Sequence, residues 1–412
     1  MDKNKANVPK IRFPGFTDPW EQRKLKQLAN FAKGQGYSKN DLTDVGTPII
    51  LYGRLYTKYQ SSISEVDTFA VPQSGSVYST GEEVIVPASG ETAEDIARAS
   101  AVVKSGFLLG GDLNIIYPNK DISTIFLALS ISNGKQQKEL SKKAQGKSVV
   151  HLHNSDLEEV TISFPCKEEQ EKIESVFAHL DNLITLHQRK LNHLQDKKKS
   201  LLQKMFPKND EDFPELRFPG FTDPWEQRKL KQLANFAKGQ GYSKNDLTDV
   251  GTPIILYGRL YTKYQSSISE VDTFAVPQSG SVYSTGEEVI VPASGETAED
   301  IARASAVVKS GFLLGGDLNI IYPNKDISTI FLALSISNGK QQKELSKKAQ
   351  GKSVVHLHNS DLEEVTISFP CKEEQEKIES VFAHLDNLIT LHQRKLNHLQ
   401  EQKKALLQQM FV

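Results

Sequence analysis

The sequence predicts an α+β fold: two globular domains joined by a pair of long antiparallel coiled-coil helices, with pseudo-two-fold symmetry. An internal repeat, the mixture of short apolar runs within it, and a coiled-coil pattern at its end lead to this prediction. Trp20 recurs as Trp225, and at this offset of 205 residues Arg12–Gln195 is identical to Arg217–Gln400. A repeat of this length is a whole domain plus a spacer, not a solenoid unit. The two copies are therefore expected to fold alike and to bind alike.

The repeat divides the chain into six segments. They are an N-terminal segment (1–19), a first globular domain (20–165), a first spacer helix (166–206), a linker (207–224), a second globular domain (225–370) and a second spacer helix (371–412). In the first domain, apolar runs predict buried strands at 84–87, 113–117 and 149–152 and helices at 25–31, 124–131 and 136–144. Frequent glycines between these runs indicate many loops.

Each spacer helix carries a coiled-coil seam. From Ile173 onward, seam residues follow one another at steps of four and three, which is the a/d pattern of paired helices, with His187 and Lys198 as polar exceptions. Acidic residues near the start and lysines near the end suit the helix dipole. The predicted interface consists of Ile173, Phe177, Leu180, Ile184, Leu191, Leu194 and Leu201 in the first helix and Ile378, Phe382, Leu385, Ile389, Leu396, Leu399 and Leu406 in the second.

The connections predict how these parts are arranged. Because the linker 207–224 is short, the second domain is expected at the far end of the first helix. The second helix then buries its seam by running back antiparallel. Two identical domains on a two-fold frame suit an inverted repeat in duplex DNA, where half-site spacing mirrors protein geometry. The alternative is that the helices only hold a two-domain protein together.

Composition sets limits on function and location. Lys plus Arg number 50 against 51 acidic residues, so a nucleic-acid binder of this composition must concentrate its cations locally. Cys166 and Cys371 are one position copied, which suggests free thiols in a reducing cytoplasm. The first residues lack the apolar run of a signal peptide, and no stretch has the length of a membrane span. We therefore expect a cytoplasmic protein with no membrane partner.

Several stretches resemble the specificity (S) subunits of type I restriction-modification systems. These stretches are Phe13–Phe16, Trp20–Leu25, Tyr52–Tyr59, Pro87–Ala93, Gln145–Leu152 and Pro165–Ile173. The resemblance covers nearly the whole chain, including its order of domain, helix, domain, helix. It implies two target-recognition domains that bind double-stranded DNA, and helices that dock two methyltransferase (M) subunits, with restriction (R) subunits joining the complex. It also implies that S-adenosylmethionine and ATP bind to those partners and that this chain binds no cofactor.

The chain departs from this family in one respect. Its two recognition domains are identical, whereas the resemblance implies two different domains that read an asymmetric bipartite site. The sequence therefore predicts an interrupted palindrome as the DNA target.

Candidate DNA contacts come from four stretches. A lysine-rich stretch at 135–147 suits phosphate contacts, although it also fits a solvated helix face. The loop at 34–39 offers glycines and lysines for a phosphate, or is an ordinary turn. Arg54 is the first choice for reading guanine, and Glu91 suits a cytosine amino group; the alternatives are a solvent-facing strand edge and a structural turn. The predicted DNA-binding residues are Lys33, Lys39, Arg54, Lys58, Glu91, Lys142, Lys143 and Lys147, with their copies Lys238, Lys244, Arg259, Lys263, Glu296, Lys347, Lys348 and Lys352.

Catalytic motifs are missing from the sequence. Gly146-Lys147-Ser148 resembles the end of a phosphate-binding loop, but Ser141 stands where that motif needs glycine. The histidines have no metal-ligand spacing, and no signature of an adenine methyltransferase is present. We therefore expect neither catalytic residues nor a metal site, which disfavours a stand-alone nuclease or methyltransferase. Two hypotheses remain: a DNA specificity subunit, and a non-catalytic scaffold that binds two copies of a protein ligand. Binding to a symmetric duplex, or co-purification with a methyltransferase, would discriminate between them.

Overall fold

The computed structural model describes residues 8–144, 146, 149–208, 211–349, 351 and 354–411. The chain folds into two compact units. One comprises Met1–His187 and Lys395–Val412, and the other comprises Gln188–Arg394. Each unit contains one globular head, the first part of the long helix that follows that head, and the last part of the other long helix. These helices are α6 (Lys167–Met205) and α12 (Lys372–Met410).

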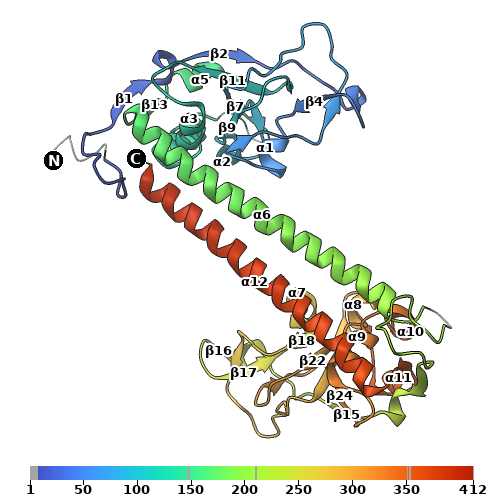
Figure 1. Ribbon diagram of the computed structural model, residues 1–412. Helices are drawn as coiled ribbons and strands as arrows, with labels where there is room; N and C mark the ends of the chain where they lie inside the picture. Colours follow the sequence, from blue (N-terminus) through green and yellow to red (C-terminus); the bar gives the residue numbers. More distant parts are fainter. Residues whose placement is uncertain are drawn as a thin grey trace. The chain divides into compact units, whose positions relative to one another are not determined.

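A five-stranded sheet forms the centre of the first head (Figure 1). The strands run in the order β2-β11-β7-β9-β5, and all neighbours are antiparallel except the parallel pair β9 and β5. Every residue of β7 is buried, so both faces of the sheet are covered. Their bounds are β2 (Ala29–Lys33), β5 (Ser62–Ile63), β7 (Glu83–Pro87), β9 (Ser100–Val102) and β11 (Leu113–Pro118).

Helices cover one face of this sheet. Val84 and Val86 point into a core that they share with these helices and with Trp20, whereas Ile85 points to the opposite face, as strand alternation requires. Beside these helices, β1 at the start of the head pairs antiparallel with β13 at its end, and β13 leads into α6. The elements are α2 (Ala93–Ile96), α3 (Thr124–Ile131), α4 (Gly134–Lys143), α5 (Asn154–Glu158), β1 (Glu21–Lys24) and β13 (Thr161–Phe164).

Short segments cover the other face. A second sheet, in the order β10-β4-β6-β3, packs there with Ile50, Leu55 and Phe107, and its pair β4 and β10 is parallel. The elements on this face are β3 (Leu42–Thr43), β4 (Thr47–Ile50), α1 (Arg54–Thr57), β6 (Phe69–Ala70) and β10 (Leu108–Leu109), with a 3₁₀ turn at Lys39–Asp41. A further two-stranded ladder joins β8 (Ser89–Gly90) to β12 (Val150–His151). Val150 of this ladder and Leu25 of a 3₁₀ turn at Leu25–Gln27 belong to the core on the helical face.

The second head repeats this architecture, with the same strand orders. Its strands are β14 (Glu226–Lys229), β15 (Ala234–Lys238), β16 (Leu247–Thr248), β17 (Thr252–Ile255), β18 (Ser267–Ile268), β19 (Phe274–Ala275), β20 (Glu288–Pro292), β21 (Ser294–Gly295), β22 (Ser305–Val307), β23 (Leu313–Leu314), β24 (Leu318–Pro323), β25 (Val355–His356) and β26 (Thr366–Phe369). Its helices are α7 (Arg259–Thr262), α8 (Ala298–Ile301), α9 (Thr329–Ile336), α10 (Gly339–Lys348) and α11 (Asn359–Glu363), with 3₁₀ turns at Leu230–Gln232 and Lys244–Asp246.

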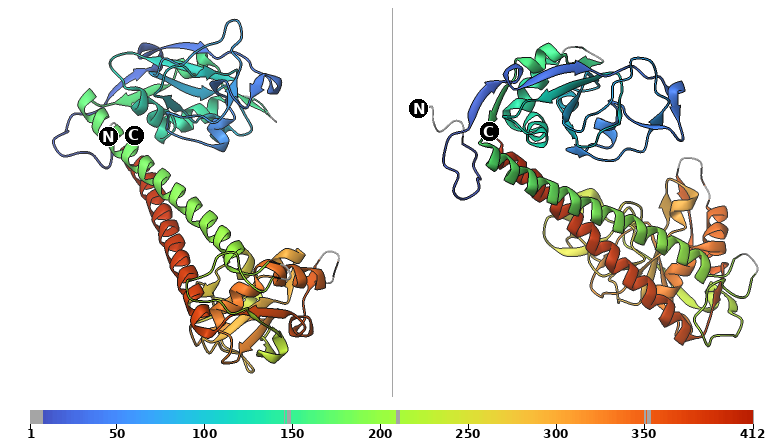
Figure 2. Two further views of the ribbon diagram at one scale, coloured as in Figure 1. Left: turned by 45° about the vertical axis from the view of Figure 1, so that its right-hand side comes forward. Right: turned by 45° about the horizontal axis from the view of Figure 1, so that its top comes forward.

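The two long helices pack together through the predicted seam. All of the predicted interface residues are buried or half-buried. In the first unit, the end of α12 lies beside the start of α6, and Figures 1 and 2 agree on this. In the second unit, the end of α6 packs against the start of α12 in the same way. The predicted fold class is therefore confirmed: repeated domains of helix and sheet, with two long helices that pack together.

An aromatic socket receives the end of each long helix. In the first unit, the rings of Trp20, Phe126 and Phe177 surround Phe411, with ring centroids 5.5 to 6.3 Å from that of Phe411. In the second unit, Phe206 occupies the equivalent socket, formed by Trp225, Phe331 and Phe382. Each head core is therefore completed by the helix that follows the other head in the sequence.

Two local predictions are wrong. The predicted helix at 25–31 is a single 3₁₀ turn followed by strand β2, because Leu25 and Leu28 fit the core at the spacing of one turn while Ala29–Lys33 pairs with β11. Of the tight loop predicted at Ser89–Thr92, the first two residues instead form strand β8, which pairs with β12, whereas Glu91 and Thr92 are bends. The strands predicted near 84, 113 and 149 and the helices predicted near 124 and 136 are confirmed. Among the described residues, no helix is long and apolar enough to cross a membrane.

Candidate nucleic-acid interface

One end of the five-stranded sheet brings several predicted contacts together. Strand register places Lys33 opposite Asn114, and Leu113 opposite Pro87, so β2 and β7 finish where β11 begins. Exposed Glu91 follows β8 just beyond this end. Asp112 also lies here, although no sequence pattern marks it. It is exposed and has a positive φ of 57°, a conformation that is uncommon outside glycine and clusters at functional sites.

The glycine-rich loop after β2 crosses the segment before β11. A Cβ atom on Gly34 would lie 1.9 Å from the Gly110 carbonyl oxygen, and a Cβ on Gly111 would lie 2.8 Å from the Gly36 Cα. These glycines are therefore required by the close approach of two backbones. The crossing keeps Lys33 and Lys39 exposed on either side of the loop, without ion pairs in the described part of the chain. Their contact with phosphate stays a prediction.

Arg54 belongs to a polar cluster within the head. Its guanidinium donates hydrogen bonds to Asp67 Oδ1 at 2.8 Å, to Gln60 Oε1 at 3.0 Å and to the Glu65 carbonyl oxygen at 3.1 Å. Only 14% of the Arg54 side chain is exposed. Lys58 also binds Asp67. The hydrogen bond from Lys58 holds the pKa of Asp67 below its ordinary value, and the charge of Arg54 adds to this effect. A bidentate guanine contact by Arg54 would compete with these bonds, and it stays a prediction.

The lysine-rich stretch forms one face of α4. Lys135, Lys138 and Lys142 are exposed at helical spacing, whereas Gln136 and Leu140 are buried on the opposite face. In the described part of the first head, these three lysines form no ion pair. Lys143 instead donates to the Asp156 carbonyl oxygen at 3.4 Å. This lysine face is where the first head carries cations that are free to meet phosphate.

Helix α2 connects this lysine face to the end of the sheet. It packs on α4 and begins at Ala93, two residues after Glu91, with Thr92 as its N-cap residue. Tyr56 also helps to shape this end, because its hydroxyl donates to the Ser89 carbonyl oxygen and burial raises the pKa of Tyr56. A Cβ on Gly90 would lie 2.8 Å from that hydroxyl, so glycine is required there.

The second head repeats these positions. Arg259 binds Asp272, Gln265 and the Glu270 carbonyl, and Lys263 binds Asp272. Lys348 donates to the Asp361 carbonyl. Lys147 and Lys352 lie outside the described residues. The remaining predicted contacts, Lys238, Lys244, Glu296 and Lys347, are exposed.

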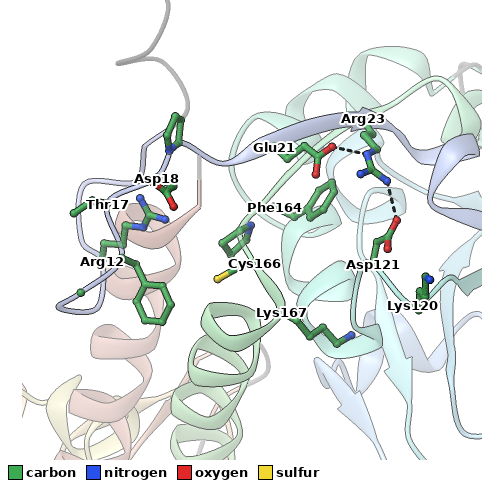
Figure 3. A pocket seen from close by; sticks show the side chains of 14 residues that line it. Arg12, Thr17, Asp18, Glu21, Arg23, Lys120, Asp121, Phe164, Cys166 and Lys167 are labelled. Carbon is green, nitrogen blue, oxygen red and sulfur yellow. Dashed lines mark hydrogen bonds and ion pairs between the residues drawn. The ribbon is translucent and has the colours of Figure 1, made fainter.

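A separate pocket of 430 Å³ lies beside the start of α6 (Figure 3). Arg12 closes one side with two hydrogen bonds of 2.8 Å to the buried carboxylate of Glu169. Across the pocket, Arg23 pairs with Glu21 and Asp121. Both arginines of the pocket are neutralised by carboxylates. The bonds between Arg12 and Glu169 attach the N-terminal arm, residues 8–19, to the start of α6. Among the described residues, no group of three or more potential metal ligands is present.

Two copies of one α+β head, each followed by a long helix that completes the other head's core, define a two-headed protein with an exact internal repeat. The family model described as "Type I restriction modification DNA specificity domain" matches residues 17–196 and 222–401. The chain therefore belongs to this family, and it is a type I specificity subunit.

Two curated relatives agree with this assignment, and both come from Methanocaldococcus jannaschii. The type I restriction enzyme MjaVIII specificity subunit is 22% identical over 74% of this chain and 73% of its own length. The putative type I restriction enzyme MjaX specificity subunit is 23% identical over 97% of this chain and 95% of its own length.

Solved structures share the fold. The S subunit of a type I restriction-modification system from M. genitalium matches with a TM-score of 0.69 and 16% identity, over 98% of this chain and 99% of that chain. A chain from a structure on the complex assembly and conformational transition of the type I R-M system matches with a TM-score of 0.50 and 15% identity, over 96% and 97%.

Proposed function

We propose that this specificity subunit reads a bipartite DNA site whose two halves are reverse complements separated by an unread spacer. The observation that carries the proposal is the identity of the two heads from Arg12–Gln195 to Arg217–Gln400. Identical heads present identical side chains, so each reads the same short sequence. A two-fold axis between them would direct those side chains to opposite strands, which makes the whole site an interrupted palindrome.

The distribution of charge supports a role in binding DNA. The net charge of the chain is −1, yet the face of α4 in the first head carries three exposed lysines without ion pairs in the described residues. Phosphate contacts of this kind position a protein on a duplex, and base contacts then specify the sequence. At the end of the sheet, Lys33 suits a phosphate contact, and the carboxylates of Asp112 and Glu91 suit a cytosine amino group.

We further propose that the long helices dock two methyltransferase subunits, and that restriction subunits join them. S-adenosylmethionine and ATP would bind to those partners, and this chain would act without catalysing a reaction. Family membership supports this proposal. Each unit also exposes a leucine on its helix pair, Leu186 in one and Leu391 in the other, each 46% exposed on a surface that is otherwise mostly polar.

Mapping of methylated adenines across the genome, with and without this gene, tests the proposal. We expect one interrupted palindromic motif to disappear when the gene is removed. A clearly asymmetric bipartite motif would contradict the two-fold model. If the motif set does not change and the purified chain binds no duplex, the chain does not specify DNA, and a scaffold for two protein ligands becomes the better explanation.

A further inference from the structure

Besides the histidine at a seam position of each unit, His187 and His392, a partly buried polar cluster interrupts the apolar seam in each unit. In the second unit, Lys198 stands at a seam position of α6, and its Nζ donates to Asp386 of α12 at 2.5 Å and to the hydroxyl of Ser266 at 3.1 Å. The Ser266 hydroxyl in turn donates to the other oxygen of Asp386. Only 15% of the Lys198 side chain is exposed, and Ser266 is 2% exposed. The cluster therefore connects both long helices and the head.

The first unit contains the equivalent cluster, formed by the repeat-related residues. Lys403 of α12 donates to Asp181 Oδ1 of α6 at 2.5 Å, and the Ser61 hydroxyl donates to Asp181 Oδ2 at 2.6 Å. The Lys403 side chain is 18% exposed and Ser61 is 3% exposed. We call these two groups the seam locks. The residues differ in position by the repeat offset, so the arrangement belongs to the repeated design of the chain.

The serine of each seam lock is held firmly by its head. Ser61 precedes the edge strand β5, and its carbonyl oxygen accepts a hydrogen bond from the Ala101 amide at 2.9 Å. The neighbouring residue Gln60 is fixed on both sides, because its side chain accepts from Arg54 and its carbonyl oxygen accepts from Ser100 at 2.6 Å. The Arg54 cluster thus positions the serine that binds the helix aspartate.

A seam of leucines alone does not fix the alignment of two helices. Sliding one helix by seven residues again places apolar residues opposite one another. A lysine at a seam position changes this, because only the observed alignment gives Lys198 both the Asp386 carboxylate and the Ser266 hydroxyl. A slide of one heptad would bring it toward Glu379, whose carboxylate already accepts from Ser328 and the Phe331 amide, so the lysine would lose its partner at a cost in free energy. A single polar seam residue of this kind is a well-attested way to specify register.

We propose that the seam locks fix the register of the helix pair and are therefore positioning residues for the spacer length of the DNA target. The inference about spacer length rests on the proposed function, whereas the inference about register does not. Lys198 with Asp386 and Ser266, and Lys403 with Asp181 and Ser61, hold each head to both helices at one alignment. The locks act through geometry and touch no base.

The test replaces both seam lysines, as Lys198→Met with Lys403→Met. The matched control replaces the adjacent exposed lysines, as Lys199→Met with Lys404→Met. Cys166 and Cys371 are the only cysteines of the 412-residue sequence and both are exposed, so spin labels can be attached to this chain without further substitutions. Electron–electron resonance then measures the distance distribution between the labels. We expect one narrow distribution for the natural protein and the control, and a broadened or multiple distribution for the seam variant.

Binding to a series of duplexes tests the functional consequence. The duplexes carry the same two half-sites with spacers of different length. The seam variant should still recognise the same half-site sequence. Its preference for one spacer, measured as the ratio of affinities for the best and the other duplexes, should fall by between about three-fold and one-hundred-fold, the range expected for contacting polar groups. The control should keep the natural preference. A merely structural role would weaken binding to every duplex alike, and would leave the spacer preference unchanged.

The outcomes separate the two proposals. If the natural protein binds no duplex, the proposed function fails, but the label distances still decide whether the locks set register. If the seam variant keeps one narrow distance distribution, or one preferred spacer, the seam-lock proposal is overturned. Should the lysine variant not fold, Asp181→Asn with Asp386→Asn removes the charge at nearly constant shape. It is then measured in the same two ways and with the same expectations.

Discussion

At the scale of single residues, Arg54 has a structural role that its predicted contact with guanine did not include. Its guanidinium joins Gln60, Glu65 and Asp67, which lie in the loops on either side of β5. Hydrogen bonds made by a charged group contribute more than neutral ones, and their loss leaves polar partners unsatisfied. Arg54, which is predicted to read guanine, therefore also stabilises the loop that carries Ser61.

Replacing this arginine should destabilise its head. We expect Arg54→Ala to lower the free energy of unfolding of the first head by about 1–3 kcal/mol, and Arg259→Ala to do the same for the second. Denaturation by urea measures this. The exposed lysine variants Lys142→Ala and Lys347→Ala serve as controls and should change stability by less than about 0.5 kcal/mol. A stable Arg54→Ala protein that loses only one half-site, by ~1–3 kcal/mol, would instead identify a base reader without a structural role.

Phe411 gives a second prediction at this scale. It is 6% exposed and fills the socket of Trp20, Phe126 and Phe177. Phe411→Ala should lower the free energy of unfolding of the first unit by about 3 kcal/mol or more, because truncating a buried ring leaves a cavity. Differential scanning calorimetry checks this. Phe213 is 47% exposed and provides the comparison: Phe213→Ala should lower the free energy of unfolding much less than Phe411→Ala.

The sequence could predict only part of the candidate site. Exposed lysines at helical spacing in α4 follow from the amphipathic pattern around Leu140. The partners of Arg54 do not, because Asp67 lies 13 residues away and reaches it through a loop whose path depends on the whole head. Asp112 gives no sequence signal of its own beyond its place after two glycines. The backbone crossing that holds it becomes visible only when both segments are in place.

At the scale of elements, the helix pair is part of the head cores. Leu399 of α12 packs against the core of the first head, and Leu194 of α6 packs against the core of the second. A carboxylate at either position would be forced toward apolar groups, which costs free energy unless the helices separate. The seam is thus a continuation of each head's interior.

Leu194→Asp or Leu399→Asp should therefore loosen the helix pair and abolish bipartite recognition. Each head should keep its sheet, because the strand pairing of β7 with β9 and β11 lies within the head and these leucines are only half-buried against its core. Binding to duplexes that carry one or two half-sites measures the first effect, and hydrogen exchange of the sheet amides measures the second. The exposed leucines provide matched controls, Leu186→Asp and Leu391→Asp, which should bind two half-sites normally. Normal bipartite binding by Leu399→Asp would contradict the model.

Long elements were predictable and short ones were not. The helix α6 follows from an unbroken apolar period, and the strands β7 and β11 follow from continuous apolar runs. The sheet of β10, β4, β6 and β3 contains strands of two residues, whose conformation is set by partners far away in the sequence. The helix predicted at 25–31 fails for the same reason, since pairing with β11 outweighs local helical spacing.

At the scale of the whole molecule, the repeat predicts that half of the chain contains a complete set of contact surfaces. A chain that ends near Phe206 carries one head, one seam and one aromatic residue to fill a socket. Two such chains should dimerise and recreate the palindromic target. They must overcome an association entropy that the covalent linker removes, so recognition should require higher protein concentration. Sedimentation and DNA binding across a concentration series measure this; a half-chain that stays monomeric at all concentrations would contradict it.

The differences between the copies modify this expectation. Lys204 pairs with Glu215 at 3.3 Å in the second unit, whereas the equivalent positions in the first unit are Gln409 and Lys10, and the Lys10 amide donates to the Gln409 carbonyl. A dimer of the first half would place Lys204 beside Lys10, two like charges. Since exposed charge pairs contribute little, we expect the dimer of the first half to associate only a few-fold more weakly than a dimer of residues 207–412.

The aromatic sockets also have a consequence for how such a gene can evolve. Because the socket residues and the phenylalanine that enters them are the same in both copies, a crossover between the two repeats in the gene would join equivalent codons without disturbing any core. The product would be a one-headed chain that still fits a second copy of itself. By the same reasoning, a head acquired by recombination would need only a compatible socket to join the existing helices. New combinations of half-sites could then arise from genetic exchange without any gradual redesign of the interior.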